Sequence, residues 1–220
     1  MIKTIMMTAA LIGATATTAN AATLVATPGS AASFAFPTLP GVTQARFDFN
    51  SAATPAGFTA AYSNATLMTG SNANGAQPEF SDGSQYLSVR GGGSATLQST
   101  TGYTLVSFFL GSIDTYNTVE ILSTTGAILQ SYTGANFTTP FPADGNQDIP
   151  VTNRRITYTV SPGDQLVGGI RFSSSSNSAE IDNVVFAVPE PSTWAMMFAG
   201  FGMIGFAMRS RRRSTKVVYA

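Results

Sequence analysis

Short apolar stretches alternate with turn-forming residues from residue 46 to residue 188. Ile156, Tyr158 and Val160 alternate with threonines, which is typical of a strand with one buried face. No stretch between these positions keeps the 3.6-residue apolar period of a helix. The pattern therefore predicts an all-β fold, a jelly-roll-like antiparallel β-sandwich. Its predicted strands lie at residues 46–49, 86–89, 94–97, 105–110, 118–122, 127–131, 155–160, 166–172 and 181–188.

Polar segments separate these strands. Residues 69–83, 134–153 and 173–178 are rich in Gly, Ser, Asn and Asp, a composition that predicts loops. The triplet Gly91-Gly92-Gly93 predicts a hairpin connection between strands 86–89 and 94–97.

The N-terminus has the three parts of a secretory signal peptide. Lys3 precedes an apolar stretch that ends at Ala19-Asn20-Ala21, so we expect a signal peptide at residues 1–21 and an extracytoplasmic β-sandwich domain at residues 22–187. An N-terminal membrane anchor is the alternative. Threonines dilute the apolar run, and the run is short for a membrane span.

A second apolar segment lies near the C-terminus. Residues 192–208 carry no charge and would reach roughly 25 Å as a helix, against a hydrocarbon core of about 30 Å. The segment predicts a single, short transmembrane helix with Trp194 at one interface. Residues 214–220 would form a cytoplasmic tail. Positive charge is preferentially retained on the cytoplasmic side, which is where we place Arg209, Arg211, Arg212 and Arg213.

The motif around this helix resembles a PEP-CTERM sorting signal over residues 188–213. The resemblance rests on Pro189-Glu190-Pro191, on Trp194, on the glycine-containing apolar segment and on the arginine cluster. It implies export through the inner membrane of a Gram-negative bacterium, a membrane-bound precursor, and processing near the Pro-Glu-Pro by an exosortase, a membrane protease or transpeptidase. Residues 214–220 extend beyond the arginines, where such signals usually end.

Composition limits the chemistry of the body. The chain contains no Cys and no His, which excludes disulfides, Ser-His triads and the usual zinc sites. Paired carboxylates remain, but Glu79, Glu120 and Glu180 show no spacing that singles out a pair, and we predict no enzyme activity. Residues 22–189 include five arginines and ten carboxylates, so the body is acidic. A nucleic-acid partner is therefore not expected.

Calcium is the one cofactor that the sequence suggests. Asp48 and Asp182 lie on the first and the last predicted strand, and Ca²⁺ prefers carboxylate and carbonyl oxygens. Asp82 and Asp114 are weaker candidates. The alternative is that Asp48 and Asp182 are ordinary turn or strand-end residues.

The body also resembles, loosely, exported β-sandwich domains of the carbohydrate-binding type. The resemblance rests on residues 109–118 and on Ile181-Asp182-Asn183-Val184. It implies that Tyr116 or Tyr132 could stack on sugars, although either could equally be a buried tyrosine with a satisfied hydroxyl. Two functions stay open: a structural or adhesive protein of the cell surface or extracellular matrix associated with exopolysaccharide, and a glycan-binding surface protein.

Overall fold

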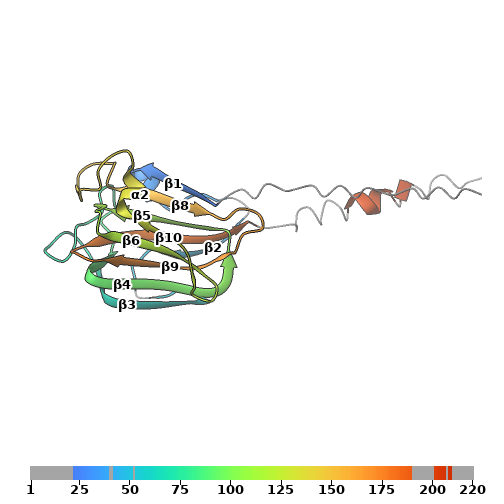
Figure 1. The fold of residues 1–220 in the computed structure, drawn as a ribbon. Coiled ribbons are helices and arrows are strands. Elements are labelled where there is room, and N and C mark those ends of the chain that lie inside the picture. Colours follow the sequence, from blue (N-terminus) through green and yellow to red (C-terminus); the bar gives the residue numbers. More distant parts are fainter. Residues whose placement is uncertain (1–21, 40–41, 52, 190–200, 207, 210–220) are drawn as a thin grey trace, which may run out of the picture.

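The structure is a computed structural model that describes residues 22–39, 42–51, 53–189, 201–206 and 208–209 (Figure 1). Within these residues the body consists of strands with two short helices between them. The elements are β1 (Thr23–Pro28), α1 (Ala31–Phe34), β2 (Val42–Phe47), β3 (Phe58–Met68), β4 (Tyr86–Tyr103), β5 (Leu105–Gly111), β6 (Asn117–Ser123), β7 (Ile128–Thr133), α2 (Gly134–Thr138), β8 (Arg154–Thr159), β9 (Val167–Ser174) and β10 (Ala179–Pro189).

All strand pairs are antiparallel, as the sequence predicts. The strands form one continuous sheet in the order β1-β8-β5-β10-β4-β9-β6-β7, with β2 paired to β10 and β3 paired to β4. β1 and β3 are not predicted from the sequence, β2 begins four residues before the predicted start at residue 46, and α2 lies in a segment predicted to be a loop. The all-β prediction is nevertheless confirmed.

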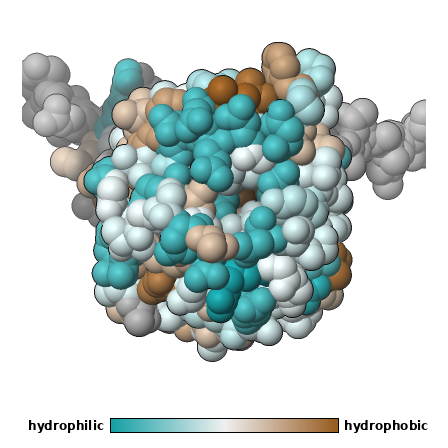
Figure 2. Space-filling view, turned by 90° about the vertical axis from the view of Figure 1, so that its left-hand side faces the viewer, coloured by the Kyte–Doolittle hydropathy of each residue, from teal (hydrophilic) through white to brown (hydrophobic). Residues whose placement is uncertain are grey.

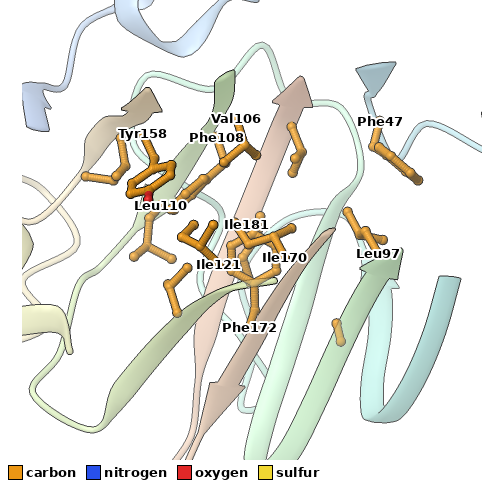
Figure 3. Packing of buried hydrophobic residues seen from close by; sticks show 14 of the residues in the cluster. Phe47, Leu97, Val106, Phe108, Leu110, Ile121, Tyr158, Ile170, Phe172 and Ile181 are labelled. Carbon is orange, nitrogen blue, oxygen red and sulfur yellow. The ribbon is translucent and has the colours of Figure 1, made fainter. Parts of the chain in front are cut away.

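The sheet curls so that its two halves face each other across the core. Phe108 of β5 packs edge-on against Phe172 of β9 with ring centroids 5.1 Å apart, although these strands are not hydrogen-bonded neighbours. Near the two ends of the sheet, the ring centroids of Tyr132 in β7 and Tyr158 in β8 lie 6.4 Å apart. Figure 3 shows side chains from both halves pointing into the shared interior. This face-to-face burial of apolar side chains is what holds a sandwich together.

The predicted hairpin at residues 91–93 is wrong. β4 runs through the glycine triplet as one strand, and β3 pairs with it on both sides of the triplet. The other edge changes partner: residues 87–89 pair with β10, whereas residues 93–98 pair with β9. Gly92 has a φ of +74°, a conformation that glycine adopts without steric cost. The triplet therefore marks the position where β4 crosses from one half of the sandwich to the other.

The outer face of β5, β8 and β10 is covered rather than exposed. The ring of Phe34, in α1, packs edge-on against Phe109 of β5 at 5.1 Å between centroids. Both rings are buried. Side chains of β10 that point away from the main core therefore meet a second layer of protein, which explains how polar residues there become buried.

The first and the last strand of the body start and end at the same side of the sheet. Thr23 is in register with Thr159, Thr159 with Leu105, and Leu105 with Ala187. The N-terminal end of β1 and the C-terminal end of β10 therefore emerge together, on the right in Figure 1. The loops at residues 69–85, 112–116 and 175–178 lie at the opposite side.

Candidate functional site

Segments that the sequence predicts as loops converge at the side opposite the chain ends. A pocket of about 270 Å³ is lined by residues of the three predicted loops and by Ser112, Asp114, Tyr116 and Glu180. The loop residues are Asn72, Ala73, Gly75, Ala76, Gly145, Gln147, Asn177 and Ser178. We call this site the polar pocket. Figure 2 looks onto this side of the molecule, where hydrophilic residues predominate and the surface is hollowed near its centre.

Glu180 forms the base of the polar pocket. It stands on the outer face of β10, near the strand's beginning, and only 1% of it is exposed. Ser112 and Ser178 donate hydroxyl hydrogen bonds to its two carboxylate oxygens, and the backbone N–H of Ala76 donates a third at 3.2 Å. The Glu180 carboxylate thus connects the three segments of the pocket wall that contain Ser112, Ser178 and Ala76. Burial raises the pKa of Glu180, the three hydrogen bonds oppose that shift, and the charge of Asp114 adds to it.

Asp114 and Tyr116 form one wall of the pocket. The Tyr116 hydroxyl donates to the carbonyl oxygen of Asn177 at 2.9 Å and also interacts with the Asp114 carboxyl. Burial raises the pKa of Asp114, its contact with Tyr116 opposes the shift, and the nearby Asp144 adds to it. Gly145 allows this arrangement, because a Cβ there would lie 2.2 Å from an Asp114 carboxylate oxygen.

The lining of the polar pocket suits the binding of a polar ligand. Both oxygens of Glu180 accept hydrogen bonds from the surrounding segments, so this carboxylate holds the base of the pocket together. The remaining lining is made of amide, hydroxyl and carboxylate groups with one half-buried tyrosine. Such groups recognise a small polar ligand by hydrogen bonds.

The two aspartates expected to bind calcium lie outside the polar pocket but near each other. Asp182 is two residues beyond Glu180 on the same face of β10 and is completely buried, whereas Asp48 directly follows β2 and is exposed. Oδ1 of Asp182 accepts the N–H of Asn183 at 2.6 Å, and its Oδ2 has no hydrogen-bond partner. Among the described residues, no three Asp, Glu, His or Cys side chains are grouped so that they could hold a metal ion as they stand.

The surroundings of Asp182 explain its electrostatics. Burial raises the pKa of Asp182 to about 8. The hydrogen bond from the Asn183 N–H and the charge of Arg155 oppose this rise. The negative charges of Asp82 and Asp48 add to it. Asp82 therefore belongs to the same neighbourhood. The sequence placed it among the weaker candidates.

Arg155 is the cation whose charge acts on Asp182, but its hydrogen bonds go elsewhere. Its Nε donates to the carbonyl oxygen of Ser33 at 2.8 Å, and Nη1 donates to that of Asn183 at 2.7 Å. Nη2 donates to the carbonyl oxygens of Phe34 and Ala35. Burial lowers the pKa of Arg155 to about 10, and the charge of Asp182 opposes that shift. Arg155 thus fastens the α1 segment to β8 and β10 without neutralising Asp182 by a direct hydrogen bond.

Most of the predicted sorting residues lie outside the described residues. Pro189 ends β10, where it is in register with Val42, and Arg209 is helical and exposed. Glu190, Pro191, Trp194, Arg211, Arg212 and Arg213 fall in undescribed segments, as does most of the apolar run. None of the helices in the described part of the chain has the length and apolar character needed to cross a membrane.

The polar pocket could not be found from sequence spacing. Glu180 and Asp114 are far apart in the chain, and the pocket exists because antiparallel strands bring their connecting loops to one side. Of the two tyrosines proposed for sugar stacking, Tyr116 lines the pocket. Tyr132 instead packs against Phe137 at 5.9 Å and against Tyr158.

Comparisons with known proteins assign the tail of the chain but not its body. No curated protein sequence matches the chain. Among solved structures, a family 29 carbohydrate-binding module matches with 14% identity and a TM-score of 0.37, over 66% of this chain and 88% of that one. The enzymatically active domain of tailspike protein 4 of bacteriophage CBA120 matches with 15% identity and a TM-score of 0.34, over 60% of this chain and 20% of that one.

The catalytic unit of a GH87 alpha-1,3-glucanase from Streptomyces thermodiastaticus matches with 12% identity and a TM-score of 0.33, over 60% of this chain and 26% of that one. Similarities of this size assign neither a ligand nor an activity. The tail is different, because residues 187–213 match a protein family over their whole length. This part of the chain is a PEP-CTERM protein-sorting motif.

Proposed function

We propose that this chain is an exported protein of the cell surface or extracellular matrix of a Gram-negative bacterium, and that an exosortase removes its tail. The observation that carries the proposal is the PEP-CTERM motif at residues 187–213. The motif begins as β10 ends: Ala187 still pairs with Leu105 and with Gln44, and β10 stops at Pro189. Cutting after Pro189 would therefore leave every strand of the body intact.

The residues of the motif have separate roles in this proposal. Pro189 and Pro191 keep the segment extended, because proline fixes φ and cannot donate a backbone hydrogen bond. Glu190 is the only charge between Asp182 and Arg209 and is the recognition contact. Trp194 sets the depth of the segment at the interface, and the arginines from Arg209 to Arg213 hold the membrane-bound precursor in orientation until it is cut.

Intact mass measurement of the protein from the cell surface tests the proposal. We expect mature chains that begin near Ala22 and end between Pro189 and Pro191. Glu190→Ala should leave the uncut precursor in the inner membrane, whereas the control Glu79→Ala, in the body, should be processed normally. A surface form that still carries residues 194–220 would show that the segment is an ordinary anchor.

For the mature body we propose a structural or adhesive role in the exopolysaccharide layer rather than catalysis. Glycan binding by the polar pocket is the second candidate. Its amide, hydroxyl and carboxylate groups beside Tyr116 favour it, because sugars are bound through hydrogen bonds to such groups and contact with an aromatic ring.

A glycan array on the full chain in detergent separates the two roles. Binding that is lost in Tyr116→Ala and kept in the control Tyr62→Ala assigns a ligand to the pocket. Tyr62 is an exposed aromatic on β3, outside the pocket. An array without any bound glycan leaves the structural role as the conclusion.

A further inference from the structure

We propose that Asp182, Asp48 and Asp82 form a Ca²⁺ site on the edge of β10, with Asp182 and Asp48 as direct ligands and Asp82 as the third carboxylate. The site is separate from the polar pocket and does not depend on the proposed function. The arrangement of the chain around Asp182 supports the site.

Three chain segments meet at this position because β10 changes partner there. Residues 179–181 of β10 pair with β4, whereas residues 184–189 pair with β2. Asp182 and Asn183 lie in the gap between the two pairings, opposite the end of β2 and the beginning of β4. A bulge in the pairing with β5 falls at the same place, and Asn183 has a φ of +48°. Strand pairing on this side of β10 is therefore interrupted at Asp182 and Asn183.

The register brings Asp48 to the gap. Phe47 is opposite Val184, so Asp48, the next residue, follows β2 toward Asn183. The segment that carries Asp82 is tied to the same place, because the N–H of Gln85 donates to the Asn50 side-chain oxygen at 3.2 Å. Asp48 and Asp82 are both exposed, so their carboxylates can turn toward an ion without breaking the core.

The unpartnered oxygen of Asp182 points to a missing ligand. Asp182 is completely buried, and its Oδ2 accepts no hydrogen bond. A buried polar atom without a partner destabilises the folded state. A bound cation satisfies this oxygen directly.

The charges around the gap fit a divalent ion. Three carboxylates and the guanidinium of Arg155 sum to a charge of −2, and Arg155 already donates to four carbonyl oxygens. All the atoms that could coordinate an ion here are oxygens, which favours a hard cation. An irregular group of carboxylate and carbonyl oxygens suits Ca²⁺ better than Mg²⁺, which requires octahedral coordination. Extracellular Ca²⁺ modules typically bind with a Kd of about 10⁻⁴–10⁻³ M.

Thermal unfolding of the full chain in detergent, after removal of divalent ions by a chelator, tests the site. CaCl₂ should raise the Tm by about 5–10 °C at one hundred times the Kd, because the ion binds only the native state. MgCl₂ should raise the Tm much less. Calorimetric titration with CaCl₂ should give one bound ion per chain.

Asp182→Asn and Asp48→Asn should abolish both the calcium-dependent rise in Tm and the titration signal. The control Asp148→Asn alters an exposed aspartate of another loop and should keep both. If Asp182→Asn does not fold, the exposed Asp48 decides the matter. The proposal is wrong if the unmodified chain binds no Ca²⁺ up to about 10 mM. It is equally wrong if Asp48→Asn leaves the rise in Tm unchanged.

Discussion

The guanidinium of Arg155 donates a hydrogen bond to the carbonyl oxygen of Asn183 at 2.7 Å, and this bond joins β8 to the bulged part of β10. The same side chain holds the carbonyl oxygens of Ser33 and Ala35 at 2.8 Å and 2.9 Å. The second layer over the outer face of the sheet is thus fastened by one buried cation.

Replacing this cation should strongly destabilise the body. Arg155→Met should lower the free energy of unfolding by about 3–5 kcal/mol, because several buried carbonyl oxygens lose their donor at once. Chemical unfolding followed by circular dichroism measures the loss. The control is Arg46→Met, whose exposed guanidinium lies 5.0 Å from the ring centroid of Phe36, and it should cost less than about 1 kcal/mol. Equal losses for the two variants would contradict the role assigned to Arg155.

In the presence of a chelator, the body should lose stability as the pH rises. Asp182 has an ordinary pKa of 3.8 and a folded-state pKa of about 8, and burial also raises the pKa of Glu180. The folded state therefore binds more protons than the unfolded state between these values. The stabilisation is complete below the ordinary pKa and is lost as the pH rises through about 8.

The free energy of unfolding should accordingly fall by up to about 1.4 kcal/mol per pH unit for each such group. Urea titrations between about pH 5 and pH 8 measure this slope. Asp182→Asn should reduce it, leaving the contribution of Glu180, and Asp148→Asn should leave it unchanged. A slope that is the same in all three chains would mean that Asp182 does not titrate in this range.

Gly92 should be needed for the crossing of β4. Its φ of +74° costs a residue with a Cβ about 1 kcal/mol, although no atom lies within 4 Å of a Cβ built there. Gly92→Ala should therefore destabilise the body by about 1 kcal/mol through backbone strain alone. Gly92→Asn should cost less, since asparagine tolerates this conformation better. A comparison of the two midpoints of chemical unfolding checks the difference, and a larger loss for asparagine would contradict the explanation.

The body should not hydrolyse polysaccharides or esters. It has no His and no Cys, and Glu180 is buried and hydrogen-bonded to Ser112, Ser178 and Ala76. Assays of the purified chain with polymeric and chromogenic substrates should give no turnover above buffer. Reproducible turnover that disappears in Glu180→Gln or in Asp114→Asn would overturn this expectation.

The strands with strong apolar alternation could be predicted from sequence, and those without it could not. Residues 105–110 and 155–160 carry a clear pattern, and both became strands at nearly the predicted bounds. β3 contains three alanines and an asparagine, residues with low β propensity, and most of its side chains are exposed or half-buried. It is a strand because β4 pairs with it, which is a long-range interaction that no local pattern reports.

The candidate sites depend on the same long-range information. Glu180 and Asp182 alternate with apolar residues along β10, and such alternation predicts that both point into solvent. Both are buried instead, because residues far away in the sequence fold over that face of the sheet. Asp48 and Asp182 could be proposed as a pair from their places on the first and the last predicted strand, but neither their closeness to Asp82 nor the unpartnered oxygen of Asp182 could be read from the sequence.

The shared side on which β1 begins and β10 ends also decides how the body would stand on a cell. If the mature protein is attached to the cell surface at Pro189, it is attached through the side of the sheet where β1 begins and β10 ends. The polar pocket lies at the far side of the same strands, so it would open outward, into the medium or the surrounding matrix, whichever way the body turns about its attachment. Attachment and recognition would then occur at opposite poles of the body, and neither would obstruct the other.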